Sequence, residues 1–539
     1  MIIRRNTGGI LSKPSRASGW QTVAMSFRAD GPNWAIATPH VEATRAGALA
    51  FERGGTAMDA AVHAAVTLAV VYPHMCGVGG DLFALVQRSD GEMLAINSSG
   101  RSPMGADPEA LANLVAVPIR GPVPITVPGA VAGWKAILET GGALPWEDAF
   151  TKAIGFAADG VAVSGSLAET LADPEAPFAD DPGLSSVFYP NRAPAPLGAT
   201  VTQPALAKTL GAIAQGGPEA LYGGTIGKAY ADGLAGAGSP ITLDDLAEHD
   251  AVTLPALRTR FRDLHVSVVP PNSQGFTLLQ MLALLERLGL EPDMDGPDAA
   301  GIADVIRVAN ADRDRHLADA ERMLVQPSTL LNEGHLASLI DAMRSAPAVH
   351  HRPDGDTIAL VAADAQGNGV SLIQSLFWGF GSGILEPTTG IVAQNRGACF
   401  TLADGHPNRF APGVRPFHTL MPVLVHDAGG LAGVAGTMGG YQQPQINLHT
   451  ITRAFVGGMH PAEAVAAPRW VVLGDAEDPT EGIGVEPGVP DRTRRSLLAS
   501  GGIGLTEADS FGHAHLIRRT ATALLAGSDP RADGSAEAG

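Results

Sequence analysis

Residues 354–375 read DGDTIALVAADAQGNGVSLIQS, and this stretch predicts a β-hairpin. The runs TIALVAA and GVSLIQS have the composition of strands, and they flank Asp364–Asn368, a turn of residues that tolerate tight backbone geometry. If the loop centres on Gln366, Thr357 lies directly opposite Ser375 with Cβ atoms ~5 Å apart. A one-residue slip would separate the two hydroxyls. The pair is either a cross-strand hydrogen bond or a nucleophile with its helper.

The composition is that of a large globular protein. The 539 residues are 45% hydrophobic and 17% charged, and the net charge is −19. Such a surface repels nucleic acid and anionic membranes, so neither is an expected partner. No apolar run approaches the ~18 residues that span a bilayer. The two cysteines, Cys76 and Cys399, make no disulfide framework and no Cys-based zinc site, so we expect a cytoplasmic protein.

The order of patterns along the chain favours an α+β layered fold. Two helical patterns within residues 41–71 are separated by a Gly-Gly pair, and two short strands follow around Asp90-Gly91. Helices dominate the middle of the chain, whereas strands dominate from Thr357 onward. Few βαβ alternations are present, which argues against a parallel sheet. Residues 1–33 and 528–539 are expected to be tails, the second one disordered.

A threonine at the start of a strand has a known chemical use. Its hydroxyl is a poor nucleophile unless a base takes the proton, and a free α-amine on the same residue, with a pKa of ~7.7–8, can do so. Thr357 is internal, so this use requires cleavage between Asp356 and Thr357. The Thr357 oxygen would attack the Asp356 carbonyl, an ester would replace the amide, and water would release the new terminus.

Several separate blocks of the sequence, in this order, resemble the gamma-glutamyltranspeptidase family of Ntn-hydrolases. They are VEATRAGALAFERGGTAMDAAVHAAVTLAVVYPHMCGVGG, PITVPGAVAGW, GPEALYGGTIGKAYAD, VVPPNSQG, the hairpin itself, FGSGI, GTMGG and APRW. The resemblance runs from about Trp34 to Ala526 and implies an αββα sandwich of two antiparallel sheets flanked by helices. It also implies a precursor that cuts itself before Thr357, leaving a large part, 34–356, and a small part, 357–527.

The resemblance also implies roles for individual residues. Ser375 falls at the position of the second hydroxyl beside the nucleophile. The backbone amides of Gly439 and Gly440, within GTMGG, fall at the oxyanion hole, where glycine lets an amide approach the developing charge. Arg101, in SSGRSP, falls at the arginine that clamps the substrate carboxylate, a task suited to its planar fork.

Other positions depart from the transpeptidase pattern. Phe377 replaces an asparagine that holds the glutamyl group, and Cys399 replaces the aspartate that pairs with the glutamyl ammonium. A pair of serines becomes His418-Thr419, and residues 400–415, a longer lid in many of those enzymes, are short here. This set of residues is similar to that of the acylase and oxamate amidohydrolase branch of the family.

These departures predict the kind of substrate. An ammonium without a carboxylate partner in a partly desolvated pocket would lose several kcal/mol of binding free energy. With Arg101 retained and Arg396 added, we expect an acyl group that carries a carboxylate but no α-amine, as in oxamate or another dicarboxylic monoamide, with water as the acceptor. Arg396 is equally compatible with a structural salt bridge.

Two alternatives to this amidohydrolase hypothesis stay open. A true γ-glutamyl hydrolase or transferase is the second hypothesis, and an uncleaved, non-catalytic carboxylate-binding relative is the third.

His513 and His515 would share a strand face, but no third ligand has suitable spacing for a metal. No cofactor motif appears, so no cofactor is expected. A dimer of processed heterodimers is compatible with the sequence, which does not specify the oligomeric state.

Overall fold

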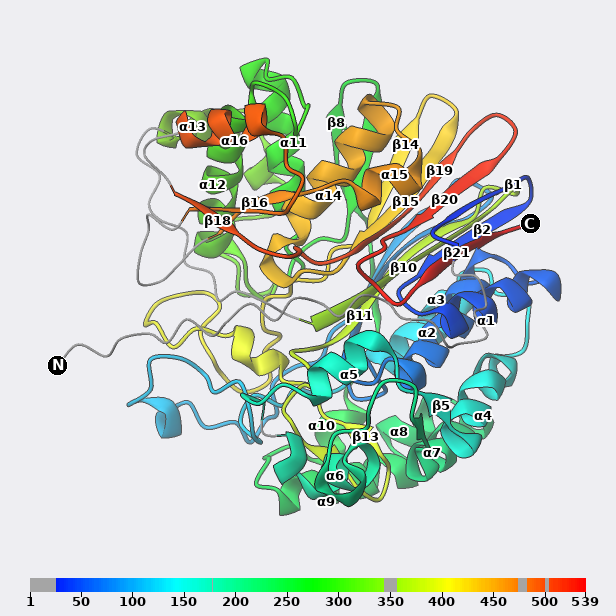
Figure 1. The fold of residues 1–539 in the computed structure, drawn as a ribbon. Coiled ribbons are helices and arrows are strands. Elements are labelled where there is room, and N and C mark those ends of the chain that lie inside the picture. The colour runs from blue at the N-terminus through cyan, green and yellow to red at the C-terminus, as the bar shows by residue number, and fades with distance from the viewer. Residues whose placement is uncertain (1–25, 177, 344–355, 474–481, 500–503) are drawn as a thin grey trace.

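The computed structural model describes residues 26–176, 178–343, 356–473, 482–499 and 504–539. Within them, most strands form two seven-stranded antiparallel sheets (Figure 1). The first has the order β21 (Ser535–Ala538), β2 (Trp34–Thr38), β10 (Asp356–Asp364), β11 (Gly369–Phe377), β3 (Asp81–Gln87), β4 (Met93–Ser98), β7 (Val252–Leu254). The second has the order β1 (Arg28–Gly31), β20 (Leu524–Ser528), β19 (Ala514–Arg519), β15 (Gly430–Thr437), β14 (Val423–Asp427), β9 (Leu264–Val268), β8 (Leu257–Phe261).

Helices cover the outer face of each sheet (Figure 1). The first sheet packs against α1 (Val41–Glu52), α2 (Ala57–Val71) and α3 (Ala130–Glu139), with α4 (Thr151–Asp159) and α7 (Pro204–Gly216) outside them. The second packs against α11 (Phe276–Leu288), α14 (Gln443–Ile451) and α15 (Pro461–Ala466), with α12 (Ala299–His316) packed on α11. The other described helices are α5 (Gly165–Leu171), α6 (Pro182–Phe188), α8 (Glu219–Tyr222), α9 (Thr225–Gly236), α10 (Leu243–Ala247), α13 (Glu333–Ala342) and α16 (Asp491–Ala499).

The alternation of side chains along β10 explains the four layers. Ile358 and Leu360 face the core shared with α2, whereas Ala359 and Val361 face the core between the two sheets. Because successive strand residues point to opposite faces, a strand that is apolar at every position must be covered on both sides. β10 is such a strand. The expected αββα sandwich is therefore confirmed.

The register of the hairpin agrees with the sequence-based expectation over most of its length. β10 and β11 pair from Ala363↔Gly369 to Ile358↔Gln374, as a loop centred on Gln366 requires. The next pair is Asp356↔Phe377, so two residues of β11 lie opposite Thr357. This is a β-bulge, which locally redirects side chains and is frequent beside active sites. The expected cleavage bond, Asp356–Thr357, lies at this bulge.

Both ends of the described chain differ from the expected tails. Residues 528–539 are not disordered: they include β21, which pairs with β2, and the Gly539 carbonyl accepts hydrogen bonds from Asn33 and Trp34 at 2.7 and 3.1 Å. At the other end, β1 pairs with β20. Each strand covers a sheet edge and forms backbone hydrogen bonds there. Because these segments are only weakly hydrophobic, their sequence does not indicate strands. Residues 1–25 of the expected N-terminal tail lie outside the described residues.

Among the described helices, none is both long and apolar enough to cross a membrane.

Candidate active site

The site begins with the two hydroxyls of the hairpin. Thr357 and Ser375 are fully buried, and Thr357 Oγ1 donates a hydrogen bond to Ser375 Oγ at 3.0 Å. They sit at the open end of β10 and β11, where the bulge interrupts the ladder. The predicted proximity of the two hydroxyls is therefore present, with a bulge that the sequence did not reveal.

Ser375 Oγ also accepts hydrogen bonds from two other groups. The backbone N–H of Phe377 donates to it at 2.7 Å, and Nη2 of Arg396 lies 3.3 Å away. Phe377 has φ +84°, a left-handed conformation that is strained for a bulky residue and that occurs most often at functional sites. This conformation is the one in which its N–H reaches back to Ser375. The donors polarise the Ser375 hydroxyl that contacts Thr357.

Arg396 brings a positive charge to the site. It is fully buried, its Nη1 donates to Thr419 Oγ1 at 3.0 Å, and the same nitrogen lies 3.6 Å from Cys399 Sγ. Among the described residues, no carboxylate forms an ion pair with Arg396. A buried guanidinium that pairs directly with no carboxylate is suited to a carboxylate ligand. The structure thus brings four sequence-predicted residues, Arg396, Ser375, Thr419 and Cys399, into one cluster.

His418 faces a buried carboxylate. Its Nε2 lies 3.1 Å from Asp81 Oδ2, and its Nδ1 accepts from the backbone N–H of Leu420 at 3.3 Å. Burial, followed by the nearby Arg396, holds the pKa of His418 well below its ordinary value, so the ring is neutral with its proton on Nε2. Burial raises the pKa of Asp81 to about 7 against a hydrogen bond from Gln394. These contacts fix the segment that carries Thr419.

The glycine loop follows β15 directly. Gly439 and Gly440 have φ values of +135° and +52°, which non-glycine residues rarely adopt. A Cβ at Gly439 would also approach Ile446 Cδ1 to 2.6 Å. Gly436, near the end of β15, packs against β10, because a Cβ at Gly436 would lie 3.2 Å from the Cβ of Ala359. The backbone geometry thus requires glycine at positions 439 and 440. β15 extends toward the end of β10 that carries Thr357.

Gln274 is a site residue that the sequence did not reveal. Its fully buried side-chain amide donates to the carbonyls of Thr419 at 2.7 Å and Gly440 at 2.9 Å, while its oxygen accepts from Arg313 at 2.9 Å. One amide therefore ties the glycine loop to the segment that contacts Arg396. Gln274 lies in the motif VVPPNSQG, the only signal in the sequence that could have indicated it.

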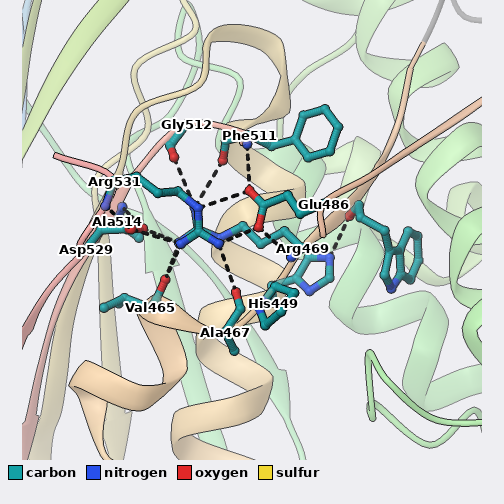
Figure 2. A network of polar contacts seen from close by, with 12 residues as sticks. His449, Val465, Ala467, Arg469, Glu486, Phe511, Gly512, Ala514, Asp529 and Arg531 are labelled. Atoms are coloured by element: carbon teal, nitrogen blue, oxygen red, sulfur yellow. Dashed lines mark hydrogen bonds and ion pairs between the residues drawn. The ribbon is translucent and has the colours of Figure 1, made fainter. Parts of the chain in front are cut away.

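A buried ion network holds the backbone at Phe511 and Gly512 (Figure 2). Arg469, of the APRW motif, pairs with Asp529 and donates to the carbonyls of Phe511 and Gly512 at 3.0 and 3.2 Å. Arg531 bridges Asp529 and Glu486. The segment held in this way accepts a hydrogen bond from Met438 N–H at the His513 carbonyl, at 2.9 Å. APRW therefore has a structural role that positions GTMGG.

Arg101 lies in a different environment. It is 37% exposed, its Nη1 donates to the Gly413 carbonyl at 3.0 Å, and its guanidinium is 3.5 Å from both Asp319 and Glu321. It lines a cavity of about 210 Å³ together with His249 and Arg415. None of these contacts joins Arg101 to the Thr357 cluster. Its role as a substrate clamp remains a prediction.

His513 and His515 form a buried pair with ring centres 5.5 Å apart. Burial lowers the pKa of His513 to about 4 and that of His515 well below its ordinary value, so both rings are neutral. Across the described segments, no three His, Cys, Asp or Glu side chains are grouped as a metal site requires. Cys76 is buried, which raises the pKa of its thiol to about 12.

Comparison with known proteins defines the class of this site. The chain is 36% identical to the oxamate amidohydrolase proenzyme of Klebsiella pneumoniae subsp. pneumoniae, over 92% of this chain and 97% of that protein. It is 34% identical to the glutathione hydrolase-like YwrD proenzyme of Bacillus subtilis, over 94% and 98% of the two chains. The structure of cephalosporin acylase from Bacillus halodurans matches with a TM-score of 0.86 at 28% identity, covering 98% of this chain and 99% of that one.

The sandwich is that of an Ntn-hydrolase, an enzyme that acts on amide C–N bonds. The family model for gamma-glutamyltranspeptidase matches residues 43–539. The chain belongs to the gamma-glutamyltranspeptidase family.

Proposed function

We propose that this protein is an autocatalytically processed amidohydrolase with Thr357 as its N-terminal nucleophile. Its substrate is an amide whose acyl part carries a carboxylate, such as oxamate or a dicarboxylic monoamide. The observation that carries the proposal is the buried contact of Thr357 with Ser375, beside a guanidinium that has no carboxylate partner among the described residues. The name of the Klebsiella relative supports the substrate class.

Maturation and turnover use the same oxygen. In maturation, Thr357 Oγ attacks the Asp356 carbonyl carbon and its proton passes to the Thr357 nitrogen. The C–N bond breaks, and the nitrogen leaves as the free α-amine of Thr357. Water then hydrolyses the ester and leaves a carboxylate on Asp356. In turnover, the amine accepts the proton of Thr357 Oγ, which attacks the substrate amide. The proton passes to the leaving amine, and water hydrolyses the acyl-enzyme.

The other predicted residues have defined tasks in this scheme. Ser375, polarised by Arg396 and by the Phe377 N–H, holds the nucleophilic hydroxyl in place. The amides of Gly439 and Gly440 stabilise the oxyanion, a contribution that typically amounts to about 10²–10³ in kcat for one donor. Arg396, together with Thr419, binds the substrate carboxylate. Phe377 and Cys399 form an apolar wall that does not accept an ammonium.

A γ-glutamyl hydrolase is the second candidate, and Asp314 favours it. This carboxylate is 31% exposed and lines the same cavity as Cys399, so it offers an acceptor for a substrate ammonium. Its Oδ1 is 2.9 Å from Nε of Arg313, which already neutralises much of its charge. We therefore favour the acyl group without the amine.

Intact-mass analysis combined with an amide screen tests the proposal. The purified protein should contain two associated fragments, 1–356 and 357–539, and should release ammonia from oxamate. A single uncut chain that binds oxamate without hydrolysing it would instead support a non-catalytic carboxylate-binding protein. Faster turnover of γ-glutamyl amides than of their des-amino analogues would support the second candidate.

A further inference from the structure

A cavity of about 550 Å³ opens beside the proposed site. Three of its lining residues are Cys399, Phe417 and Tyr441. Cys399 contacts Arg396, Phe417 immediately precedes His418, and Tyr441 immediately follows Gly440. The cavity wall therefore includes residues that contact, or adjoin in the chain, three separate parts of the site.

The wall is aromatic and apolar where it adjoins the site. Phe417 and Tyr441 have ring centres 5.4 Å apart, and both pack on the cluster of Phe377, Ala398 and Cys399. Arg313, which also lines the cavity, lies over the Tyr441 ring, with its guanidinium carbon 5.4 Å from the ring centre. Its Nη1 donates to the Tyr441 carbonyl at 3.1 Å. The aromatic wall is thus held in place before any ligand arrives.

The size of the cavity does not match a small substrate. Pockets of ~300–1,000 Å³ bury most of the surface of a drug-sized ligand, whereas oxamate has only about six non-hydrogen atoms. Oxamate would leave the aromatic wall in contact with water, which is unfavourable because the free energy of burial scales with the apolar area removed from water. An occupant with a broad apolar face would cover it.

We propose that this cavity receives an aromatic substituent of the amide substrate, carried on the acyl or the amine side, which packs on Phe417 and Tyr441. The inference rests on the proposed function for the identity of the reacting amide. It extends that function, because it makes the preferred substrate an aryl-substituted amide rather than oxamate itself. Arg313 and Asp314 also line the cavity, so the substituent lies beside these two polar residues.

Two matched substrate pairs test this inference. N-phenyloxamate against oxamate places the ring on the amine side, and 2-phenylmalonamate against malonamate places it on the acyl side. We expect the aryl member of at least one pair to have a kcat/KM at least tenfold higher, and the pair concerned identifies the side. The same four compounds are titrated by calorimetry into Thr357→Ala, in which binding is measured without turnover, and the same aryl preference is expected in Kd.

Ala116→Trp tests the location of the ring. Ala116 lines the cavity, so the larger side chain should lower the aryl-to-small ratio at least tenfold. Ala112→Trp is the matched control: Ala112 is exposed in the same segment but does not line the cavity, and the ratio should stay at the wild-type value. An unchanged ratio in Ala116→Trp would overturn the assignment.

The outcomes separate this inference from the proposed function. Hydrolysis of the small amides with no aryl preference in either pair, in kcat/KM or in Kd, would overturn the inference and leave the proposed function standing. Preferential binding of an aryl amide to Thr357→Ala, with no amide hydrolysed by the wild-type protein, would support the cavity assignment and overturn the proposed function.

Discussion

The guanidinium carbon of Arg396 lies 4.2 Å from the ring centre of Phe377, and both residues contact the oxygen of Ser375. A cation over an aromatic face in a desolvated site gains about 2 kcal/mol. Phe377 therefore has two effects, since its backbone orients Ser375 and its ring holds the buried charge. Neither effect requires an ammonium group on the substrate. The proposed specificity for acyl groups without an α-amine rests on this arrangement.

The first prediction concerns this specificity. Because the site has Arg396 over Phe377 and no acceptor at Cys399, glutaryl-anilide should be hydrolysed faster than γ-glutamyl-anilide. Arg396→Met should lower kcat/KM for glutaryl-anilide by ~10²-fold or more and affect acetanilide much less, since a carboxylate clamp contributes ~2–5 kcal/mol. Rates of aniline release measure both effects, and thermal melting checks that the variant is folded.

Arg101→Ala is the matched comparison for Arg396→Met. Arg101 is paired with Asp319 and Glu321 and lines another cavity, so its loss should have the smaller effect on glutaryl-anilide. A larger loss for Arg101→Ala would place the carboxylate clamp at Arg101. Faster turnover of γ-glutamyl-anilide than of glutaryl-anilide would contradict the expected discrimination.

The second prediction concerns maturation. Thr357→Ala should remain a single chain without activity, because it has no oxygen to attack the Asp356 carbonyl. Thr357→Ser retains a hydroxyl and should be cut. Intact-mass measurement shows the state of the chain, and Thr522→Ala, at an exposed threonine, should be processed like the wild type. Full activity in an uncut wild-type chain would refute the mechanism.

Ser375 is the subject of the third prediction. Its oxygen is 3.0 Å from Thr357 Oγ1, so Ser375→Ala should slow both self-cleavage and turnover, whereas Ser375→Thr should retain both. The time course of fragment formation and kcat measure the two rates. If both rates were unchanged in Ser375→Ala, the hydroxyl contact would have no role in catalysis.

The fourth prediction concerns Gln274. Loss of its amide releases the carbonyls of Gly440 and Thr419 from each other, so Gln274→Ala should lower kcat by about tenfold or more, as expected when an oxyanion loop is misplaced. KM should change less.

Gln280→Ala is the matched control for Gln274→Ala. Gln280 is another fully buried glutamine of the same region, and it contacts Asp312 and the Leu330 carbonyl instead of the site. This variant should lose stability but keep the wild-type kcat. Equal kcat losses in the two variants would show that Gln274 acts only through folding.

The fifth prediction is a pH dependence of stability. Burial lowers the pKa of His513 to about 4, while the unfolded chain takes up this proton near ~6.5. Between these values the unfolded state binds more protons, so stability is lost as the pH falls. In His513→Gln, the loss of unfolding free energy between about pH 7 and 5 should be smaller by about 2 kcal/mol. Denaturant titrations at both pH values measure it.

A His513→Gln variant with the wild-type dependence would mean that His513 is protonated in the folded protein, contrary to its burial.

Local pattern was enough to predict much of the fold. The α1–α2 pair, the strands β3 and β4, and the hairpin register from Ile358 to Ala363 all follow from periodicity and turn residues. The terminal strands β1 and β21 could not be predicted in this way, because their stability comes from backbone pairing with β20 and β2, which are distant in the sequence.

The sequence alone determined an α+β layered fold through its local periodicity, and the order of its motifs determined the family resemblance, which implied the αββα layering and the candidates Thr357, Ser375 and Arg396. Only the tertiary structure decided how these residues meet. The bulge opposite Thr357 appears only in the strand pairing. The Gln274 amide between Thr419 and Gly440 and the pairing of Arg101 with Asp319 and Glu321 depend on contacts between distant segments. Such contacts form only when both sheets are packed, because the partners of each buried polar group come from different layers.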